Sequence, residues 1–306
     1  MTANPKMNDP GRLLVVVCGP TATGKTSVAI RLAQTLKTEI LSADSRQFYR
    51  EMQIGTARPR ADELALVPHH FIGHISISQA YDASRYENDA LGVLEKLFHL
   101  NRTAILTGGS GLYINAVCHG IDNLPEPDQE VREKMKILYG KEGIAGLRSM
   151  LKILDPVYYD QVDLANPKRL LRAIEVCIIT GKPYSFLRTN KTKPRNFSVL
   201  KIGLQREKEE LYERINARVD QMMADGLLAE AEGLLPFRHM NALNTVGYKE
   251  LFTYFDGDIS LDMALQNIKT HSRNYAKRQM TWLRKDPSIT WFHSDQVEEI
   301  INFIFS

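Results

Sequence analysis

Short apolar runs alternate with amphipathic segments along most of this chain. Each run is nearly continuous, as in a strand covered on both faces, and the segments between the runs repeat apolar residues at helical spacing. Strands that alternate with helices in this way form parallel β-α-β units. The predicted strands are residues 12–18, 39–44, 103–108, 198–205 and 288–293. The pattern therefore predicts an α/β core with a parallel sheet.

Residues 121–196 depart from this alternation. Pro-bearing polar segments stand at both ends of the stretch, and the patterns between them are helical. The clearest helix follows Asn166, a natural N-cap, and Pro167, a natural first helical residue. Its apolar stripe consists of Leu170, Leu171, Ile174 and Ile178. We therefore predict a core of residues 1–120 and 197–306, into which a helical domain of residues 121–196 is inserted.

Composition places the chain among ordinary globular proteins. Of its 306 residues, 43% are hydrophobic and 25% are charged. No apolar stretch reaches the roughly 18–20 residues of a membrane span, and the first twelve residues lack the apolar core of a signal peptide. Cys18, Cys118 and Cys177 are too far apart for a disulfide framework or a zinc site, and Cys18 is predicted to lie in the core. We expect a cytoplasmic monomer without a membrane partner.

Positive charge is concentrated in two tracts, although the net charge is only +3. The first tract, residues 167–195, has eight basic residues and a single acid, Glu175. The second, residues 269–285, has six basic residues and no acid. One such tract is usually a solvated face. Two of them in a nearly neutral chain favour an anionic partner, first of all nucleic acid.

Residues 19–26 form a predicted phosphate-binding loop. The sequence GPTATGKT fits the pattern G-x-x-x-x-G-K-[ST], between a predicted strand and a helical pattern. Its glycines let backbone N–H groups surround phosphate oxygens, and the helix N-terminus adds partial positive charge. Lys25 supplies a charge to the terminal phosphates, and Thr26 supplies a hydroxyl to Mg²⁺. The predicted contacts are Gly19, Pro20, Thr21, Ala22, Thr23, Gly24, Lys25 and Thr26.

Asp44 follows a predicted strand and is therefore expected at the carboxyl end of the sheet, beside this loop. A carboxylate there fits a magnesium ligand, a helix cap, or a general base for a nucleophile that attacks near the phosphates. The strand of residues 103–108, which could carry an acid of the ATPase type, continues into Gly109 instead. Ordinary nucleotide hydrolysis is therefore disfavoured.

Six ordered motifs resemble the tRNA dimethylallyltransferase (tRNA isopentenyltransferase) family. They extend from Gly19 to Arg284 and read GPTATGKT, SADSRQFYREMQIGTARP, GGSGLYINAV, NPKRLLRAIEV, TVGYKEL and YAKRQMTWLR. No Cys/His pattern follows Arg284, which favours the bacterial type over eukaryotic relatives with a zinc finger. The resemblance implies a P-loop NTPase-like parallel sheet flanked by helices, with a helical insertion that binds tRNA.

The resemblance also implies a reaction. These enzymes transfer a dimethylallyl group from dimethylallyl diphosphate to the N6 amine of the adenosine on the 3′ side of the anticodon, and pyrophosphate leaves. Lys25, the loop amides and Mg²⁺ on Thr26 would stabilise the charge that grows on the leaving group. By their match to family motifs, Asp44 would accept the amine proton and Ser110 would contact the donor or the target nucleotide. Arg218 would reach the pyrophosphate, although an arginine on an amphipathic helix is usually solvated.

The target adenosine is stacked in an RNA loop, so the enzyme has to extract it. Gln47 fits the reading of a base edge because its amide both donates and accepts hydrogen bonds. Lys269, Arg273, Lys277 and Arg284 would form a stripe within about 80° on one helix. The predicted contacts with the tRNA anticodon stem-loop are Asp44, Ser45, Arg46, Gln47, Ser110, Arg132, Lys168, Arg169, Leu170, Leu171, Arg172, Lys277 and Arg278.

Three features receive a structural interpretation. His69 and His70 are adjacent on an extended segment, where neighbouring side chains point apart, so they are not expected to bind a metal together. Gly73 stands where an acidic residue is common in the family, which leaves the role of its loop open. Trp282 and Trp291 are predicted to lie in the core.

Three alternatives remain at this point. A P-loop kinase of a small metabolite would use Asp44 toward a hydroxyl, but it gives the basic tracts no role. An adenylate isopentenyltransferase would perform the same chemistry on free nucleotides and would not need the basic insertion. A nucleotide-switched RNA-binding protein would not require Asp44.

Overall fold

The computed structural model describes residues 11–306. The chain divides into two compact units: unit 1 is residues up to Cys118 together with Pro194–Ser306, and unit 2 is His119–Lys193. The expectation about a signal peptide concerns the first twelve residues and lies almost entirely outside the described part. Between residues 11 and 306, no helix has both the length and the apolar character needed to cross a membrane.

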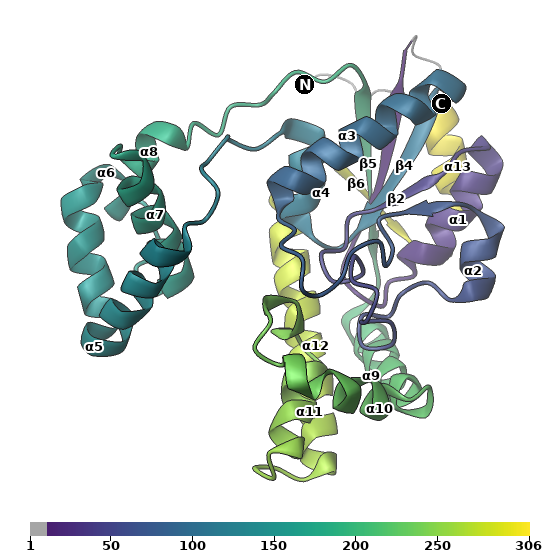
Figure 1. Cartoon of the computed structure of the whole chain (residues 1–306). Coiled ribbons are helices and arrows are strands. Elements are labelled where there is room, and N and C mark those ends of the chain that lie inside the picture. The colour runs from purple at the N-terminus through teal and green to yellow at the C-terminus, as the bar shows by residue number, and fades with distance from the viewer. Residues whose placement is uncertain (1–10) are drawn as a thin grey trace. The chain divides into compact units, whose positions relative to one another are not determined.

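Unit 1 is built on a parallel sheet with the strand order β3-β2-β4-β1-β5-β6 (Figure 1). The strands are β1 Leu13–Cys18, β2 Ile40–Ser42, β3 His69–His70, β4 Thr103–Gly108, β5 Ser198–Gln205 and β6 Ile289–His293. This confirms the predicted parallel α/β core and each of the five predicted strands. The additional strand β3 has two residues at the edge of the sheet, which is too short to produce a recognisable apolar run.

Helices cover both faces of the sheet, which explains why the central strands are apolar throughout. On one face, Leu13, Val15 and Val17 pack with residues of α1 (Lys25–Leu36) and α13 (Val297–Phe305). On the other, Leu14, Val16 and Cys18 pack with α3 (Ala83–Leu100) and α4 (Gly111–His119). Cys18 is 1% exposed, as predicted for a core residue.

The remaining elements of unit 1 surround the loops at one end of the sheet. They are α2 (Ala61–Leu66), α9 (Lys208–Ala224), α10 (Leu227–Leu234), α11 (Tyr248–Phe255), α12 (Leu261–Leu283) and the short 3₁₀ helices η1 (Leu235–Phe237) and η2 (Asn241–Leu243). Helix α12 packs against α9 and α11 (Figure 1). In the lower part of this view, α12 lies beside α9, α10 and α11, which precede it in the chain.

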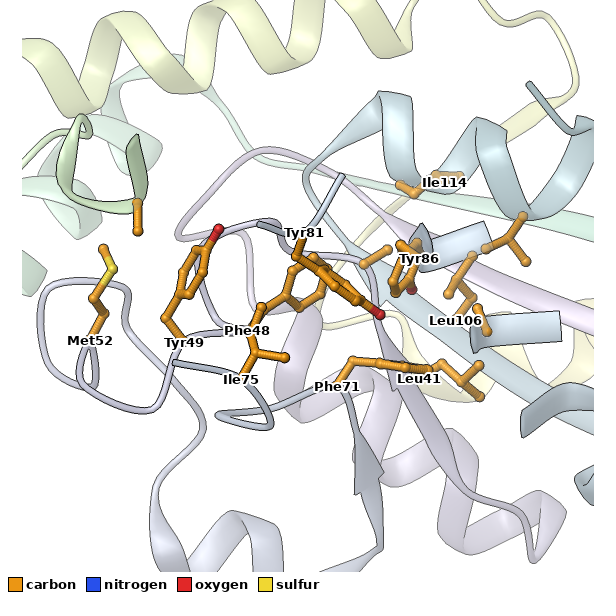
Figure 2. Packing of buried hydrophobic residues seen from close by; sticks show 14 of the residues in the cluster. Leu41, Phe48, Tyr49, Met52, Phe71, Ile75, Tyr81, Tyr86, Leu106 and Ile114 are labelled. Atoms are coloured by element: carbon orange, nitrogen blue, oxygen red, sulfur yellow. The ribbon is translucent and has the colours of Figure 1, made fainter. Parts of the chain in front are cut away.

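An aromatic cluster lies beneath the segment that follows β2. Phe48 stacks on Tyr86 with ring centroids 5.2 Å apart and meets Tyr81 edge-on at the same distance (Figure 2). The Tyr86 hydroxyl donates to the Ser42 carbonyl at 2.8 Å. Phe48 and Tyr86 are completely buried. Tyr86 holds Ser42 on one side of the polar segment Asp44–Gln47, and Phe48 follows the segment on the other side, so both of its ends are fixed by packing.

Unit 2 is a helical domain with its own core. It contains α5 (Gln129–Leu154, interrupted at Gly143), α6 (Pro156–Tyr159), α7 (Pro167–Thr180) and α8 (Tyr184–Leu187). The prediction for α7 is confirmed, since the Asn166 side chain accepts a hydrogen bond from the Arg169 amide. The core consists of Met135, Leu147, Leu151, Tyr158, Leu170, Ala173 and Ile174.

The two ends of unit 2 lie next to each other. The Lys193 amide donates to the His119 carbonyl at 2.7 Å. Nearby, Asp122 accepts from the Thr189 hydroxyl at 2.6 Å and from the Asn190 amide at 2.9 Å. The segments that enter and leave the unit are thus hydrogen-bonded side by side.

The strand register brings three loops of unit 1 together. Cys18 at the end of β1 is paired with Gly108 at the end of β4, and Ser42 at the end of β2 is paired with Thr107. Parallel strands that end in register release their loops at one edge of the sheet. The phosphate-binding loop, the segment after Asp44 and the segment before Ser110 therefore start side by side.

Candidate active site

The loop after β1 has the geometry of a phosphate cradle. Gly24 adopts φ 95°, in the left-handed region where a side chain would be strained, and α1 begins directly after it at Lys25. The Thr23 hydroxyl donates to the Pro20 carbonyl at 2.9 Å, which closes the loop on itself. The free amides at the start of α1 thus point toward the space enclosed by the loop, where an anion would bind.

Lys25 is held inside this loop. Its Nζ donates to the Pro20 carbonyl at 2.7 Å. Burial, reinforced by the positive charge of Arg218, lowers the pKa of Lys25 to about 8. The charged form of Lys25 is therefore destabilised in this position, and a bound anion would stabilise it.

Two arginines of α9 contact the same loop. Arg218 donates to the Thr21 hydroxyl at 3.1 Å, and Arg214, one turn earlier, donates to the Ala22 carbonyl at 3.0 Å. Burial, and then the charge of Arg214, lower the pKa of Arg218. Arg218 is therefore not the solvated side chain that is usual on an amphipathic helix, and its contact with pyrophosphate stays a prediction. Arg214 was missed by sequence reasoning, although its spacing of four residues from Arg218 was a usable signal.

These groups line a cleft of about 860 Å³ in unit 1. Its walls bring together the phosphate-binding loop, Asp44, the arginines of α9 and the segment from Gln53 to Ala61. Of the predicted site residues, the lining includes Thr21, Ala22, Gly24, Lys25, Thr26, Asp44, Arg46, Gln47 and Arg218. The cleft therefore combines a cationic end with a carboxylate and an amide.

Asp44 is oriented by its own loop. Its Oδ1 accepts a hydrogen bond from the Arg46 amide at 3.0 Å, which leaves Oδ2 to receive a proton. The neighbouring Ser45 amide donates to the Ser110 hydroxyl at 3.2 Å. Ser110 also interacts with the Tyr275 hydroxyl, whose pKa is raised by burial and then by the charge of Asp44. Ser110 thus links Tyr275 to the Ser45 amide, directly after Asp44 in the chain.

Arg46 and Gln47 are engaged within the protein. The Arg46 guanidinium donates to the carbonyls of Asn241 and Ala242, both at 3.0 Å. The Gln47 amide donates to the carbonyls of Thr56 and Ala57 at 3.3 and 3.1 Å, and the Ser42 hydroxyl donates to its oxygen at 3.4 Å. Gln47 therefore supports the wall of the cleft in this structure, and its reading of a base edge stays a prediction.

A second hollow of about 630 Å³ adjoins the cleft. The two share Arg46, Thr245, Val246 and Tyr275 in their linings. The lining of the second hollow is rich in amides and charged groups, namely Asn244, Lys249, Glu250, Asn267, His271, Asn274 and Arg278. Sequence reasoning singled out only Arg278 of this set.

The predicted contacts in unit 2 fall into two groups. Lys168 and Arg169 are exposed at the start of α7, as an RNA contact requires. Arg132 and Arg172 instead bind the two oxygens of the buried Glu175 carboxylate, each at 2.7 Å. The Leu170 side chain is fully buried in the core of unit 2 and Leu171 packs against that core, so a contact of Leu170 with RNA stays a prediction for its backbone alone.

The predicted basic stripe on α12 is only partly exposed. Lys269 forms an ion pair with Asp220 at 2.6 Å, and Arg273 donates to Asn216 at 2.7 Å. Both partners lie on α9, so this half of the stripe joins two helices. Lys277, Arg278 and Arg284 are exposed.

The structural interpretations have mixed outcomes. Trp282 is 37% exposed and covers the backbone of Gly111, so its assignment to the core is wrong, whereas Trp291 is half-buried against the core. The His69 ring lies 2.8 Å from the Val67 carbonyl, and the His70 ring lies 2.6 Å from the Glu39 carboxylate.

Gly73 lies against the Arg58 guanidinium, because a Cβ atom at this position would be only 2.6 Å from Arg58 Nη2. Among residues 11–306, no three His, Cys, Asp or Glu side chains are grouped as metal ligands.

The chain is similar in sequence to proteins of one family. A family model described as IPP transferase matches residues 47–286. The chain is 51% identical to tRNA dimethylallyltransferase 1 of Phocaeicola vulgatus over 293 residues, which cover 96% of this chain and 98% of that protein. It is 50% identical to tRNA dimethylallyltransferase 1 of Bacteroides thetaiotaomicron, with 95% of this chain and 94% of that protein covered.

Solved structures share the fold. The tRNA isopentenylpyrophosphate transferase of Bacillus halodurans is 36% identical and superposes with a TM-score of 0.70, over 96% of this chain and 95% of its own. A eukaryotic dimethylallyltransferase acting on tRNA is 23% identical, with a TM-score of 0.77 over 95% of this chain and 76% of its own. The second likeness concerns the fold alone.

Proposed function

The chain belongs to the IPP transferase family, and on that premise we propose that its cleft performs the family's tRNA prenylation. A dimethylallyl group passes from dimethylallyl diphosphate to the N6 amine of the adenosine on the 3′ side of the anticodon, and pyrophosphate leaves. The carrying observation is that the phosphate-binding loop and Asp44 open into one cleft. We further propose that the protein acts on tRNA in the cytoplasm.

The cationic end of the cleft suits the diphosphate. As the allylic C–O bond breaks, negative charge grows on the departing pyrophosphate. Lys25, Arg218 and the amides at the start of α1 are grouped around the position that this charge would occupy. Preorganised donors of this kind stabilise a transition state more than a ground state because their orientation is already fixed.

Thr26 is suited to a magnesium ion that arrives with the diphosphate. Thr26 lines the cleft next to Lys25. Mg²⁺ commonly takes few protein ligands and completes its coordination with phosphate oxygens and water, so a single hydroxyl fits this donor set. When bound, the ion would neutralise part of the charge of the leaving group.

Asp44 is proposed as the general base. The N6 nitrogen forms a bond to the first carbon of the dimethylallyl group and then has to lose a proton. Asp44 Oδ2 can accept that proton, because Oδ1 is already occupied by the Arg46 amide. Ser110 accepts from the Ser45 amide and interacts with Tyr275, and we propose that it contacts the donor or the target nucleotide.

The second hollow supports entry of the target nucleoside from the side opposite the phosphates. It meets the cleft at Arg46 and Tyr275, next to the polar side chains around Asp44. Asn244, Asn267 and Asn274 offer donors and acceptors for base edges, and Arg278 carries charge for the RNA backbone. Lys168 and Arg169 of unit 2 and Lys277 of α12 are proposed to bind further phosphates.

The reaction is tested with unmodified tRNA, dimethylallyl diphosphate and Mg²⁺, followed by mass spectrometry of the digested nucleosides. We expect prenylated adenosine only when the prenyl donor is present, with ATP alone as the control. Free AMP is offered in a parallel reaction, where the proposal predicts no product. Prenylated AMP without prenylated tRNA would identify an adenylate isopentenyltransferase, and ATP consumption with a metabolite would identify a kinase.

A further inference from the structure

Gln279 is a buried amide at the centre of the proposed site. It lies on the last third of α12 and is 7% exposed, next along the helix face to the buried Ala276 and Leu283. A polar side chain at such a position has to find partners within the protein. Its side chain also lines the cleft.

The two halves of this amide bind two different loops. Its Oε1 accepts from the Thr21 amide at 2.9 Å, and its Nε2 donates to the Gly109 carbonyl at 2.9 Å. A Cβ atom at Gly109 would lie 2.2 Å from Nε2, so a side chain there would displace the amide. Because one partner is a donor and the other an acceptor, only one orientation of the Gln279 amide satisfies both.

One of these loops is proposed to bind the diphosphate, and the other lies next to the proposed base, Asp44. Thr21 belongs to the phosphate-binding loop and receives the Arg218 guanidinium. Gly109 precedes Ser110, which holds Ser45 directly after Asp44. One turn earlier on α12, Tyr275 contacts the same Ser110. A single side chain thus joins the diphosphate end of the cleft to the base end.

We propose that Gln279 is a positioning residue for prenyl transfer, which keeps the phosphate-binding loop and the Ser110 loop at a fixed separation. The inference rests on the proposed function. The reacting carbon is held by one loop and the proton acceptor by the other, so a shift between them misaligns the attack. Misplacement by about 1 Å can cost about 100-fold in rate without abolishing binding.

Gln279→Met tests the proposal because it keeps the length of the side chain and removes both hydrogen bonds. We expect kcat to fall by about 10- to 100-fold, while the KM for dimethylallyl diphosphate changes by less than about threefold. Gln266→Met is the matched control, since Gln266 is exposed on the same helix. The melting temperature of both variants is measured alongside.

Gln279→Glu adds a readout that a purely structural role would not change. An ionised carboxylate can accept from Thr21 but cannot donate to Gly109, whereas a protonated one can do both. The ratio of variant to wild-type kcat should therefore rise as the pH falls through the pKa of the new carboxyl. Gln266→Glu should show a constant ratio.

Three results would overturn the proposal. Gln279→Met could retain the wild-type kcat, it could lose kcat only in proportion to its folded fraction, or it could raise the donor KM alone, which would make Gln279 a donor ligand. Wild-type enzyme is assayed first. A wild type that forms no prenylated adenosine would overturn the proposed function as well, so the two failures are distinguishable.

Discussion

The positive charge of Lys25 is destabilised by burial in the protein without a bound anion. Burial lowers its pKa from 10.5 to about 8, and Arg218 adds a like charge nearby. The unfolded chain, with the ordinary pKa, binds more protons than the folded chain between about pH 8 and 10.5. Stability of the ligand-free protein therefore rises with pH across that window, and the charged lysine costs stability below it.

Binding of an anion should reverse this effect. We predict that the affinity for inorganic pyrophosphate falls as the pH rises above about 8, because the neutral lysine has to take up a proton on binding. Calorimetry in buffers of different ionisation enthalpy measures that uptake directly. Lys25→Met should bind more weakly and show no uptake near pH 8, whereas an unchanged uptake would assign the proton to another group.

Asp44 can be tested at the same scale. Asp44→Asn keeps the shape of the side chain and its hydrogen bond from the Arg46 amide, but it removes the proton acceptor. We expect kcat to fall by about 10²- to 10⁴-fold, with pyrophosphate affinity largely unchanged. Asp62→Asn on the exposed surface of α2 is the control. Turnover of Asp44→Asn near the normal rate would exclude Asp44 as the base.

At the scale of elements, the cleft depends on one anchored loop. Glu230 on α10 accepts from the amides of Gln53, Ile54 and Gly55 at 2.9, 2.8 and 2.9 Å. The Tyr248 hydroxyl of α11 donates to the same carboxylate at 2.6 Å. Gln47 holds the next residues of the loop. This wall of the cleft is therefore fixed by helices that follow it by more than 170 residues.

Removal of that anchor should be measurable as stability. Glu230→Ala leaves three amides and a hydroxyl without their carboxylate, and we expect it to lower the free energy of unfolding by about 2 kcal/mol. Urea unfolding measures the change. Glu232→Ala, which alters an exposed residue of the same helix, should be nearly neutral. If both variants lose the same amount, the loop does not depend on Glu230.

Elements were predictable where local signals were strong. The strand β1 is covered on both faces, so its sequence is continuously apolar, and α7 has its cap, stripe and terminal glycine in sequence. Contacts between distant elements leave no such signal. Nothing near Arg218 indicates the loop that buries it, and nothing near Leu170 separates a core position from an RNA contact. The roles of Gln279 and Glu230 likewise depend on tertiary structure.

At the scale of the whole molecule, RNA binding is proposed to use charges from both units. In unit 2 the buried Glu175 pairs with Arg172 of the first basic tract, and also with Arg132, which lies before the tract and stays exposed, so part of the local positive charge is neutralised. Lys168 and Arg169 retain their exposure. The surface available to phosphates is therefore smaller than the count of basic residues indicates.

This difference predicts which substitutions weaken tRNA binding. Lys168→Ala with Arg169→Ala should weaken it and should reduce the slope of log affinity against log salt by about two, if each residue neutralises one phosphate. The KM for dimethylallyl diphosphate should not change. Lys141→Ala, on the exposed surface of α5, is the control. An unchanged salt slope in the double variant would place the RNA elsewhere.

The pairing of Lys193 with His119 has a further consequence for how such a chain can change over evolution. A module whose entry and exit touch can be enlarged, exchanged or deleted as a cassette, because the host needs only a short bridge to close the gap. The catalytic groups proposed for the reaction all lie outside the cassette, in unit 1. Under the proposed function, changes within unit 2 can therefore alter how RNA is bound while the groups proposed for the chemistry stay unchanged.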